Sequence, residues 1–194
     1  KLYADYRWQP GEPSRPTFSQ AELNAAVAAA HDAGRQVSAH ATNAEAMRRA
    51  TLAGVDTIEH GDNGTPEVFK LMAARGVTFC PTLAASDAVA RYRGWNGAEP
   101  APATVRDSRA ALAAARAAGV TICVGGDVGV YAHGTNAREV ELLVAAGMPA
   151  SEALHAVTAG NAKSFGVGDK VGRIAPGLLA DLVAVDGDPR ADIA

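Results

Sequence analysis

The chain has 194 residues, of which 48% are hydrophobic and 20% are charged, and its formal net charge is -3. This composition is typical of a soluble globular domain with a sizeable core. The near-balanced charge, without Lys- or Arg-rich runs, argues against nucleic acid or a membrane surface as a partner. No apolar stretch is long enough to cross a bilayer, and no signal-peptide pattern follows Lys1.

The first part of the chain predicts helices that end at glycines. Residues 1–6 are predicted to form a strand, and residues 8–18, with three prolines and one glycine, a loop. Ser19 and Glu22 form a capping-box pattern, which predicts a helix that ends at Gly34. The segment 84–102, rich in Gly, Pro and Arg, is interpreted as a loop. Further helices are predicted over residues 43–53, 65–76, 103–118, 136–146 and 151–165.

Short apolar runs follow the helix-ending glycines and predict buried parallel strands. With the first strand there are five of them: KLYADY, VSAH, VDTIEH, VTFC and VTICVGGD. Strands that alternate with helices in this way indicate βαβ units, so the predicted fold class is α/β. A complete eight-stranded barrel needs about 250 residues. We therefore expect residues 1–166 to form the C-terminal portion of a TIM (β/α)8 barrel.

Residues 167–194 show a different sequence pattern, with short apolar runs, turns at Pro176-Gly177 and Asp186-Gly187, and no helical period. They are predicted to form two or three strands of a separate small sheet. The chain starts at Lys1 without an initiator Met, so we expect a segment of a longer protein. For that reason the sequence does not decide the cellular compartment of the protein, although we favour the cytoplasm. The cysteines Cys80 and Cys123 lie in apolar strand-like runs and are expected to be buried free thiols rather than a disulfide or a metal site.

Three predicted strands end on residues that can bind a metal. VSAH ends at His40, VDTIEH at His60 and VTICVGGD at Asp127. In a parallel α/β barrel the C-terminal ends of successive strands converge on one face, so these side chains are expected to meet there. Neutral imidazole and carboxylate are the usual ligands of zinc and similar divalent ions. The pattern therefore predicts a metal-dependent hydrolase. His133, in the loop after the last strand, is either a substrate contact or an ordinary loop residue.

The segments VSAHATN, TIEHGDNGTPEVFKLMAARGVTFCPT, VGGDVGVYAHGTNARE and VGRIAPGLLADLVAVDGDP resemble the C-terminal two thirds of a metal-dependent amidohydrolase. The branch is the one related to Xaa-Pro dipeptidases and imidazolonepropionases. This resemblance implies a TIM barrel flanked by a small β-sandwich, to which the strands after Phe165 would belong. It also implies that His40, His60 and Asp127 bind metal and that Lys1 is a carboxylated lysine that bridges two metals. The family's first-strand His-x-His pair has no counterpart here.

The resemblance implies the chemistry as well. Binuclear Zn2+ in the full-length protein would activate a water for attack on an amide C–N bond, with Asp127 as general base and then general acid. Tyr6, Arg7 and His133 are the candidate substrate contacts. Asn43 stands where related deaminases carry a glutamate, which argues against deamination.

Three functions stay open on the sequence. The first is hydrolysis of a dipeptide or N-acyl amino acid, the second is hydrolysis of a cyclic amide, and the third is a non-catalytic truncated homologue. The expected partner is a small-molecule or dipeptide substrate. Unpaired sheet edges and exposed apolar surface also predict a homo-oligomer.

Overall fold

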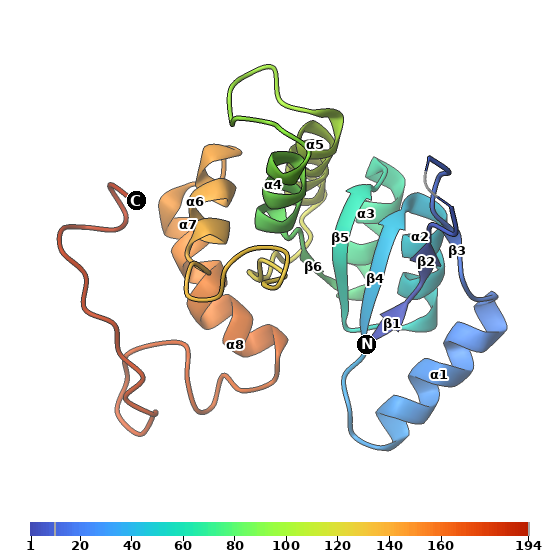
Figure 1. Cartoon of the computed structure of the whole chain (residues 1–194). Helices are drawn as coiled ribbons and strands as arrows, with labels where there is room; N and C mark the ends of the chain where they lie inside the picture. The colour runs from blue at the N-terminus through green and yellow to red at the C-terminus, as the bar shows by residue number, and fades with distance from the viewer. Residues whose placement is uncertain (10, 194) are drawn as a thin grey trace.

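The computed structural model describes residues 1–9 and 11–193, and its centre is a parallel sheet of four strands (Figure 1). The strands follow the order β1-β4-β5-β6 across the sheet. Residues 121–123 continue this order, because Ile122 forms a parallel bridge with Phe79 of β6. The predicted parallel α/β arrangement is thus confirmed, whereas closure into a barrel stays a prediction. The strands are β1 (Leu2–Tyr3), β4 (Ser38–Asn43), β5 (Thr57–Asn63) and β6 (Thr78–Cys80).

The helices α1 (Gln20–Asp32), α2 (Ala44–Ala53) and α3 (Pro66–Arg75) begin and end close to their predicted positions. Local side chains explain this agreement. The hydroxyl of Ser19, the amide oxygen of Asn43 and the hydroxyl of Thr65 each accept a hydrogen bond from a backbone N–H in the first turn that follows. At the other end of α2, Gly54 adopts the left-handed conformation that ends the helix.

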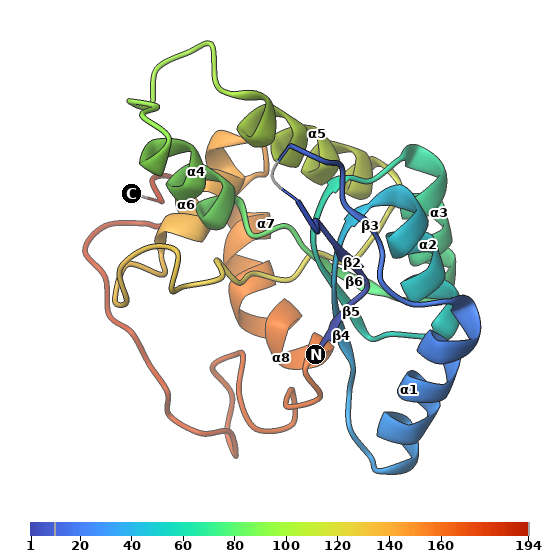
Figure 2. The same cartoon turned by 45° about the vertical axis from the view of Figure 1, so that its right-hand side comes forward.

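The first predicted strand is interrupted at Ala4. Its second half, β2 (Asp5–Tyr6), leaves the sheet and pairs with β3 (Arg15–Pro16) in a short antiparallel ladder. This ladder lies at one end of β4, as Figure 2 shows. The interruption matters for the site, because it places Asp5 beside β4 rather than within the sheet.

The segment 84–102 does not form the predicted loop throughout, because α4 (Leu83–Tyr92) occupies its first half. Thr82 precedes this helix and is of a residue type that commonly caps helices, but its side chain makes no capping hydrogen bond here. The N-terminus of α4 is instead bound by Glu139, a residue far along the chain. The next helix, α5 (Ala103–Ala117), agrees with its prediction and packs against β5 and α3.

The C-terminal helices lie on the side of the molecule away from α1 (Figure 1). They are α6 (Arg138–Ala145), α7 (Ala150–His155), the π-helical turn η1 (Ala156–Gly160) and α8 (Asn161–Ser164). The Asn161 side chain accepts a hydrogen bond from the N–H of Val124 and donates one to its carbonyl. These two hydrogen bonds attach the end of this helical layer to the segment that leads to Asp127.

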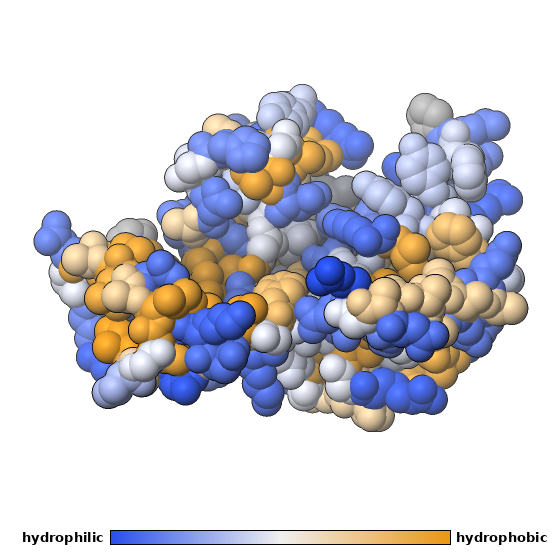
Figure 3. All heavy atoms as spheres, turned by 90° about the horizontal axis from the view of Figure 1, so that it is seen from below, coloured by the Kyte–Doolittle hydropathy of each residue, from blue (hydrophilic) through white to orange (hydrophobic). Residues whose placement is uncertain are grey.

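None of the strands predicted after Phe165 is formed among residues 167–193. A strand needs a partner strand for its backbone groups, and no other described segment pairs with this one. Its apolar side chains consequently lie exposed. Figure 3 shows hydrophobic residues gathered on the left of the lower face, the side on which the C-terminal segment lies in Figure 1. The exposed set includes Ile174, Leu179, Leu182, Val183 and Val185.

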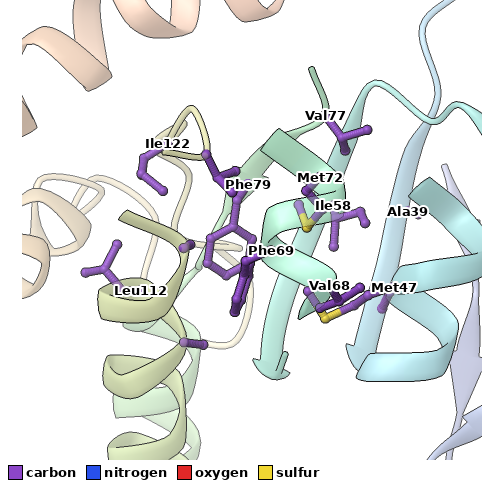
Figure 4. Packing of buried hydrophobic residues seen from close by; sticks show 14 of the residues in the cluster. Ala39, Met47, Ile58, Val68, Phe69, Met72, Val77, Phe79, Leu112 and Ile122 are labelled. Carbon is purple, nitrogen blue, oxygen red and sulfur yellow. The ribbon is translucent and has the colours of Figure 1, made fainter. Parts of the chain in front are cut away.

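The core fills the space between the sheet and its covering helices (Figure 4). Phe69 of α3 and Phe79 of β6 lie with their ring centroids 5.2 Å apart. Gly61 permits this packing, because a Cβ atom there would collide with the Phe79 ring. Ile58, Met47 and Met72 complete this part of the cluster. Within the described residues, no helix is both long enough and apolar enough to cross a membrane.

The expectation of free thiols is wrong, because a disulfide joins Cys80 and Cys123. The cause is strand register. Phe79 and Ile122 are bridge partners on adjacent parallel segments, so the residues that follow them lie side by side, with Cα atoms 4.7 Å apart. That separation lies within the range that a disulfide spans.

Candidate active site

Two histidines meet at the C-terminal end of the parallel sheet. His40 lies on β4 and His60 on the adjacent strand β5, where Ala41 and His60 are register partners. Their imidazole centroids are 4.6 Å apart, with the ring planes inclined by 66°. Neither strand ends at its histidine, since β4 runs on to Asn43 and β5 to Asn63. The sequence therefore predicted correctly that the two rings lie close together, but it placed the ends of both strands too early.

The ring of His60 is fixed by Thr82. The Nδ1 atom of His60 and the Oγ1 atom of Thr82 are 2.7 Å apart, a hydrogen bond between β5 and the residue that precedes α4. Burial lowers the pKa of His60 to about 4; electrostatic interactions with His40 and Lys1 act in the same direction, and those with Asp127 and Asp5 oppose it. At neutral pH His60 is therefore an uncharged imidazole. Its Nε2 atom makes no hydrogen bond with any described residue, and in the tautomer in which Nδ1 donates to Thr82 the lone pair of Nε2 can bind a cation.

The ring of His40 is held between an aromatic side chain and a buried carboxylate. Tyr3 stacks on it at a centroid distance of 4.7 Å, and Asp5 places Oδ1 3.4 Å from its Nε2 atom. Asp5 is fully buried and accepts hydrogen bonds of 2.7 Å from the backbone N–H groups of Thr42 and Asn43. Burial alone would raise the pKa of Asp5, but the hydrogen bonds from His40, Asn43 and Thr42 outweigh it and lower the pKa. Asp5 is thus an ionised carboxylate, and it orients the ring of His40.

Asp127 and Lys1 contribute charge to the same region. The side chain of Asp127 is exposed, and its backbone has a φ of 57°, which is uncommon outside glycine. Its charge raises the pKa of His60, and the charge of exposed Lys1 lowers it. Both predicted residues therefore act electrostatically on His60, although neither hydrogen-bonds to it.

The three predicted substrate contacts are exposed side chains. Tyr6 is 48% exposed, and its ring lies 6.5 Å from Tyr3 and 5.2 Å from Trp8, measured between centroids. The rings of Tyr3, Tyr6 and Trp8 thus extend a row of adjacent rings that begins with His60 and His40. Arg7 and His133 are also exposed, Arg7 just after β2 and His133 in the loop after Asp127. A surface hollow of about 470 Å³ between α4 and α6 includes Tyr131 but none of these three residues.

The amidohydrolase family model matches residues 6–194, which is nearly the whole chain. The chain belongs to the amidohydrolase family. An uncharacterised protein of Mycobacterium tuberculosis is 36% identical over 90% of this chain and 48% of its own length. The ochratoxinase of Aspergillus niger is 30% identical over 93% of this chain and 38% of its own length. A crystal structure of a Xaa-Pro dipeptidase with methionine in its active site is 40% identical, with a TM-score of 0.84 over 92% of this chain and 46% of that one.

These similarities place this amidohydrolase in the dipeptidase-like branch. The chain spans about half the length of the mycobacterial relative, and less of the ochratoxinase. It likewise spans less than half of the dipeptidase chain, of which 46% is covered.

Amidohydrolases are generally metal-dependent, and the side chains present fit a metal in part. The two adjacent imidazoles are suitable zinc ligands, and one of them is neutral with an open Nε2 atom. Asp62, two residues beyond His60, has a buried Oδ1 atom without a hydrogen-bond partner among the described residues. Yet among residues 1–9 and 11–193 no group of three or more His, Cys, Asp or Glu side chains has the arrangement to hold a metal. The histidine pair is the part of a donor set that these residues supply.

Sequence reasoning missed Asp5, Thr82 and Glu139. A signal was present for Glu139, because it lies three and four residues before Leu142 and Leu143 on the apolar stripe of α6. A charged residue on such a stripe is buried and needs partners. Asp5 and Thr82 carry no comparable signal, since their importance depends on contacts between distant segments.

Proposed function

We propose that this amidohydrolase cleaves an amide C–N bond of a dipeptide or an N-acyl amino acid. The observation that carries the proposal is the adjacent placement of His40 and His60 at the ends of neighbouring parallel strands. The family assignment supports amide hydrolysis, and the similarity to a Xaa-Pro dipeptidase supports a dipeptide-like substrate. The ligand expected at the site is therefore a small molecule.

In this proposal His40 and His60 hold Zn2+, together with Asp127 and a carboxylated Lys1 in a binuclear site of the full-length protein. A bound zinc would polarise the scissile carbonyl and acidify the attacking water. The chain's own residues prepare the site for that ion. Thr82 and Asp5 fix the two imidazole rings, and burial keeps His60 uncharged and able to bind a cation.

Asp127 is the proposed general base and general acid. Its carboxylate is exposed at the same end of the sheet, where it can accept a proton from water and donate it to the leaving amine. Tyr6, at the end of β2, and the loop residues Arg7 and His133 are proposed to contact the substrate around this end. Arg7 suits a substrate carboxylate, because a guanidinium forms paired hydrogen bonds with that group.

The larger architecture belongs to the same proposal. The parallel sheet would be part of a TIM barrel, and residues 167–194 part of a β-sandwich that covers their exposed apolar side chains. Assembly as a homo-oligomer and a cytoplasmic location stay predictions.

A hydrolysis screen of the full-length protein tests the function. Xaa-Pro and other dipeptides, N-acyl amino acids and cyclic amides are supplied with Zn2+, and amine release is measured. We expect turnover of dipeptides or N-acyl amino acids, with a loss of at least 100-fold in His60→Asn and Asp127→Asn. His155→Asn is the control, because His155 is exposed on α7. Turnover of cyclic amides alone, or full activity in His60→Asn, would contradict the proposal.

A further inference from the structure

Thr82 has an unusual backbone conformation for a β-branched residue. Its φ of 51° and ψ of 47° lie in the left-handed region, which such residues rarely adopt. The side chain is nearly fully buried, and its hydroxyl lies 2.7 Å from Nδ1 of His60. A strained backbone of this kind persists only where surrounding contacts hold it. Those contacts therefore decide where the hydroxyl points.

Glu139 supplies these contacts from α6. Its carboxylate is fully buried and accepts the N–H of Leu83 at 2.9 Å on one oxygen and the N–H of Ala84 at 2.6 Å on the other. These two residues directly follow Thr82 and begin α4. The carboxylate thus fixes the peptide units that leave Thr82.

The arrangement resolves a conflict at Thr82. A threonine immediately before a helix normally caps it, with its hydroxyl accepting an N–H of the first turn. Here the hydroxyl bonds to His60 instead, and α4 has no cap from its own N-terminal residue. Glu139 instead accepts hydrogen bonds from N–H groups at the start of α4, so the hydroxyl of Thr82 is available to bond to His60.

We propose that Glu139 is a positioning residue of the candidate active site, which acts on His60 through Thr82. It keeps Thr82 in the left-handed conformation, in which the hydroxyl binds Nδ1 of His60 and leaves Nε2 for the metal. The metal part of this inference rests on the proposed function, whereas the link from Glu139 to the His60 ring does not. Partners that orient metal-binding histidines typically change metal affinity 10- to 100-fold when they are removed.

The experiment measures the His60 ring and zinc binding separately. In the metal-free full-length protein, ¹⁵N NMR of the imidazole nitrogens reports the tautomer and hydrogen bonding of His60. Zinc affinity is then measured by competition with a chelator. The variants are Glu139→Gln, Thr82→Val, which lacks the hydroxyl at nearly the same size, Thr82→Ser, which keeps it, and the double variant. Glu141→Gln, on the same helix but paired with Arg138, is the control.

We expect Glu139→Gln and Thr82→Val each to change the His60 nitrogen signals and to weaken zinc binding about 10- to 100-fold. Thr82→Ser and Glu141→Gln should resemble the wild type. Because Glu139 acts through Thr82, the double variant should bind zinc no more weakly than Thr82→Val alone. Unchanged His60 signals in folded Glu139→Gln, or losses that add in the double variant, would overturn the proposal.

Glu139→Asp covers the case in which Glu139→Gln does not fold. It keeps the charge, but its side chain is one methylene too short to reach both N–H groups. A folded Glu139→Asp protein with wild-type His60 signals and zinc affinity overturns the proposal as well. If the wild type binds no zinc, the proposed function fails, and the NMR comparison still decides the link between Glu139 and His60.

Discussion

Asp5 lies 3.4 Å from His40, with its Oδ1 atom facing the Nε2 atom of the imidazole, and its side chain is fully buried. The same carboxylate accepts two backbone N–H groups from the end of β4. Asp5 therefore joins the first strand region to the histidine strand, and its carboxylate is stabilised by His40 and by the backbone and hydroxyl donors of β4.

Replacement of Asp5 by Asn should destabilise the protein by roughly 2 kcal/mol, since hydrogen bonds to a charged group are lost. The folded state lowers the pKa of Asp5 below its ordinary value of 3.8. Its stabilisation is therefore present above about that pH and is lost as the pH falls through the lower folded pKa. Urea unfolding at pH 7 and near pH 3 measures the difference, with exposed Asp32→Asn as control. An equal difference at both pH values would contradict this assignment.

Glu139 should give stability the opposite dependence on pH. Burial raises its pKa from 4.5 to about 7, against the effect of the two backbone hydrogen bonds. The folded state thus holds the proton more tightly than the unfolded state. The resulting stabilisation is complete below about pH 4.5 and is lost as the pH rises through about 7, in total roughly 3 kcal/mol.

Denaturant unfolding of wild type and Glu139→Gln between pH 4 and 9 checks this dependence. The wild type should lose stability relative to the variant across that interval, because Gln does not titrate. Neighbouring Tyr131, whose pKa is itself raised, titrates only at higher pH. Parallel stability profiles for the two proteins would show that Glu139 ionises normally.

Gly61 should tolerate no larger side chain. It has a φ of 60°, and an added Cβ would strike the ring of Phe79. Gly61→Ala combines a left-handed alanine with overpacking, so we expect a loss of roughly 2–4 kcal/mol. Gly54→Ala is the matched control, since Gly54 is also left-handed but has open space around its Cα. Its loss should be only about 1 kcal/mol. Equal losses in thermal or urea unfolding would mean that the contact with Phe79 relaxes freely.

Lys1 is the predicted bridging ligand, and its replacement tests the binuclear assignment. In the full-length protein, Lys1→Ala should reduce the zinc content per chain and lower turnover, because the bridge between two cations is lost. Added short carboxylic acids should restore part of the activity. Metal analysis that finds two zinc ions per chain in Lys1→Ala, with full turnover, would disprove the carboxylated lysine.

Much of the fold could be predicted because its signals are local. Ser19, Asn43 and Thr65 cap the helices that directly follow them, so sequence spacing alone locates α1, α2 and α3. Helix α4 escaped prediction because its cap, Glu139, lies on another helix. The strands predicted after Phe165 are absent because their apolar residues have no pairing strand among the described segments.

The residues of the candidate site likewise fall into those that the sequence could predict and those that it could not. His40 and His60 could be predicted as neighbours, because equivalent positions on successive parallel strands lie side by side. Asp5 and Thr82, which hold these two rings, could not, because their contacts depend on the exit of β2 from the sheet and on the start of α4. The disulfide between Cys80 and Cys123 likewise required the register of two segments far apart in the chain.

Zinc affinity of the full-length protein tests the central claim most directly. Competition titrations with a chelator would compare the wild type with His40→Ala, His60→Ala and the exposed-histidine control His155→Ala. If the histidine pair binds the metal, both site variants should lose at least 100-fold in affinity, and His155→Ala should match the wild type. Zinc binding of equal strength in all four proteins would contradict the claim that His40 and His60 form the metal site.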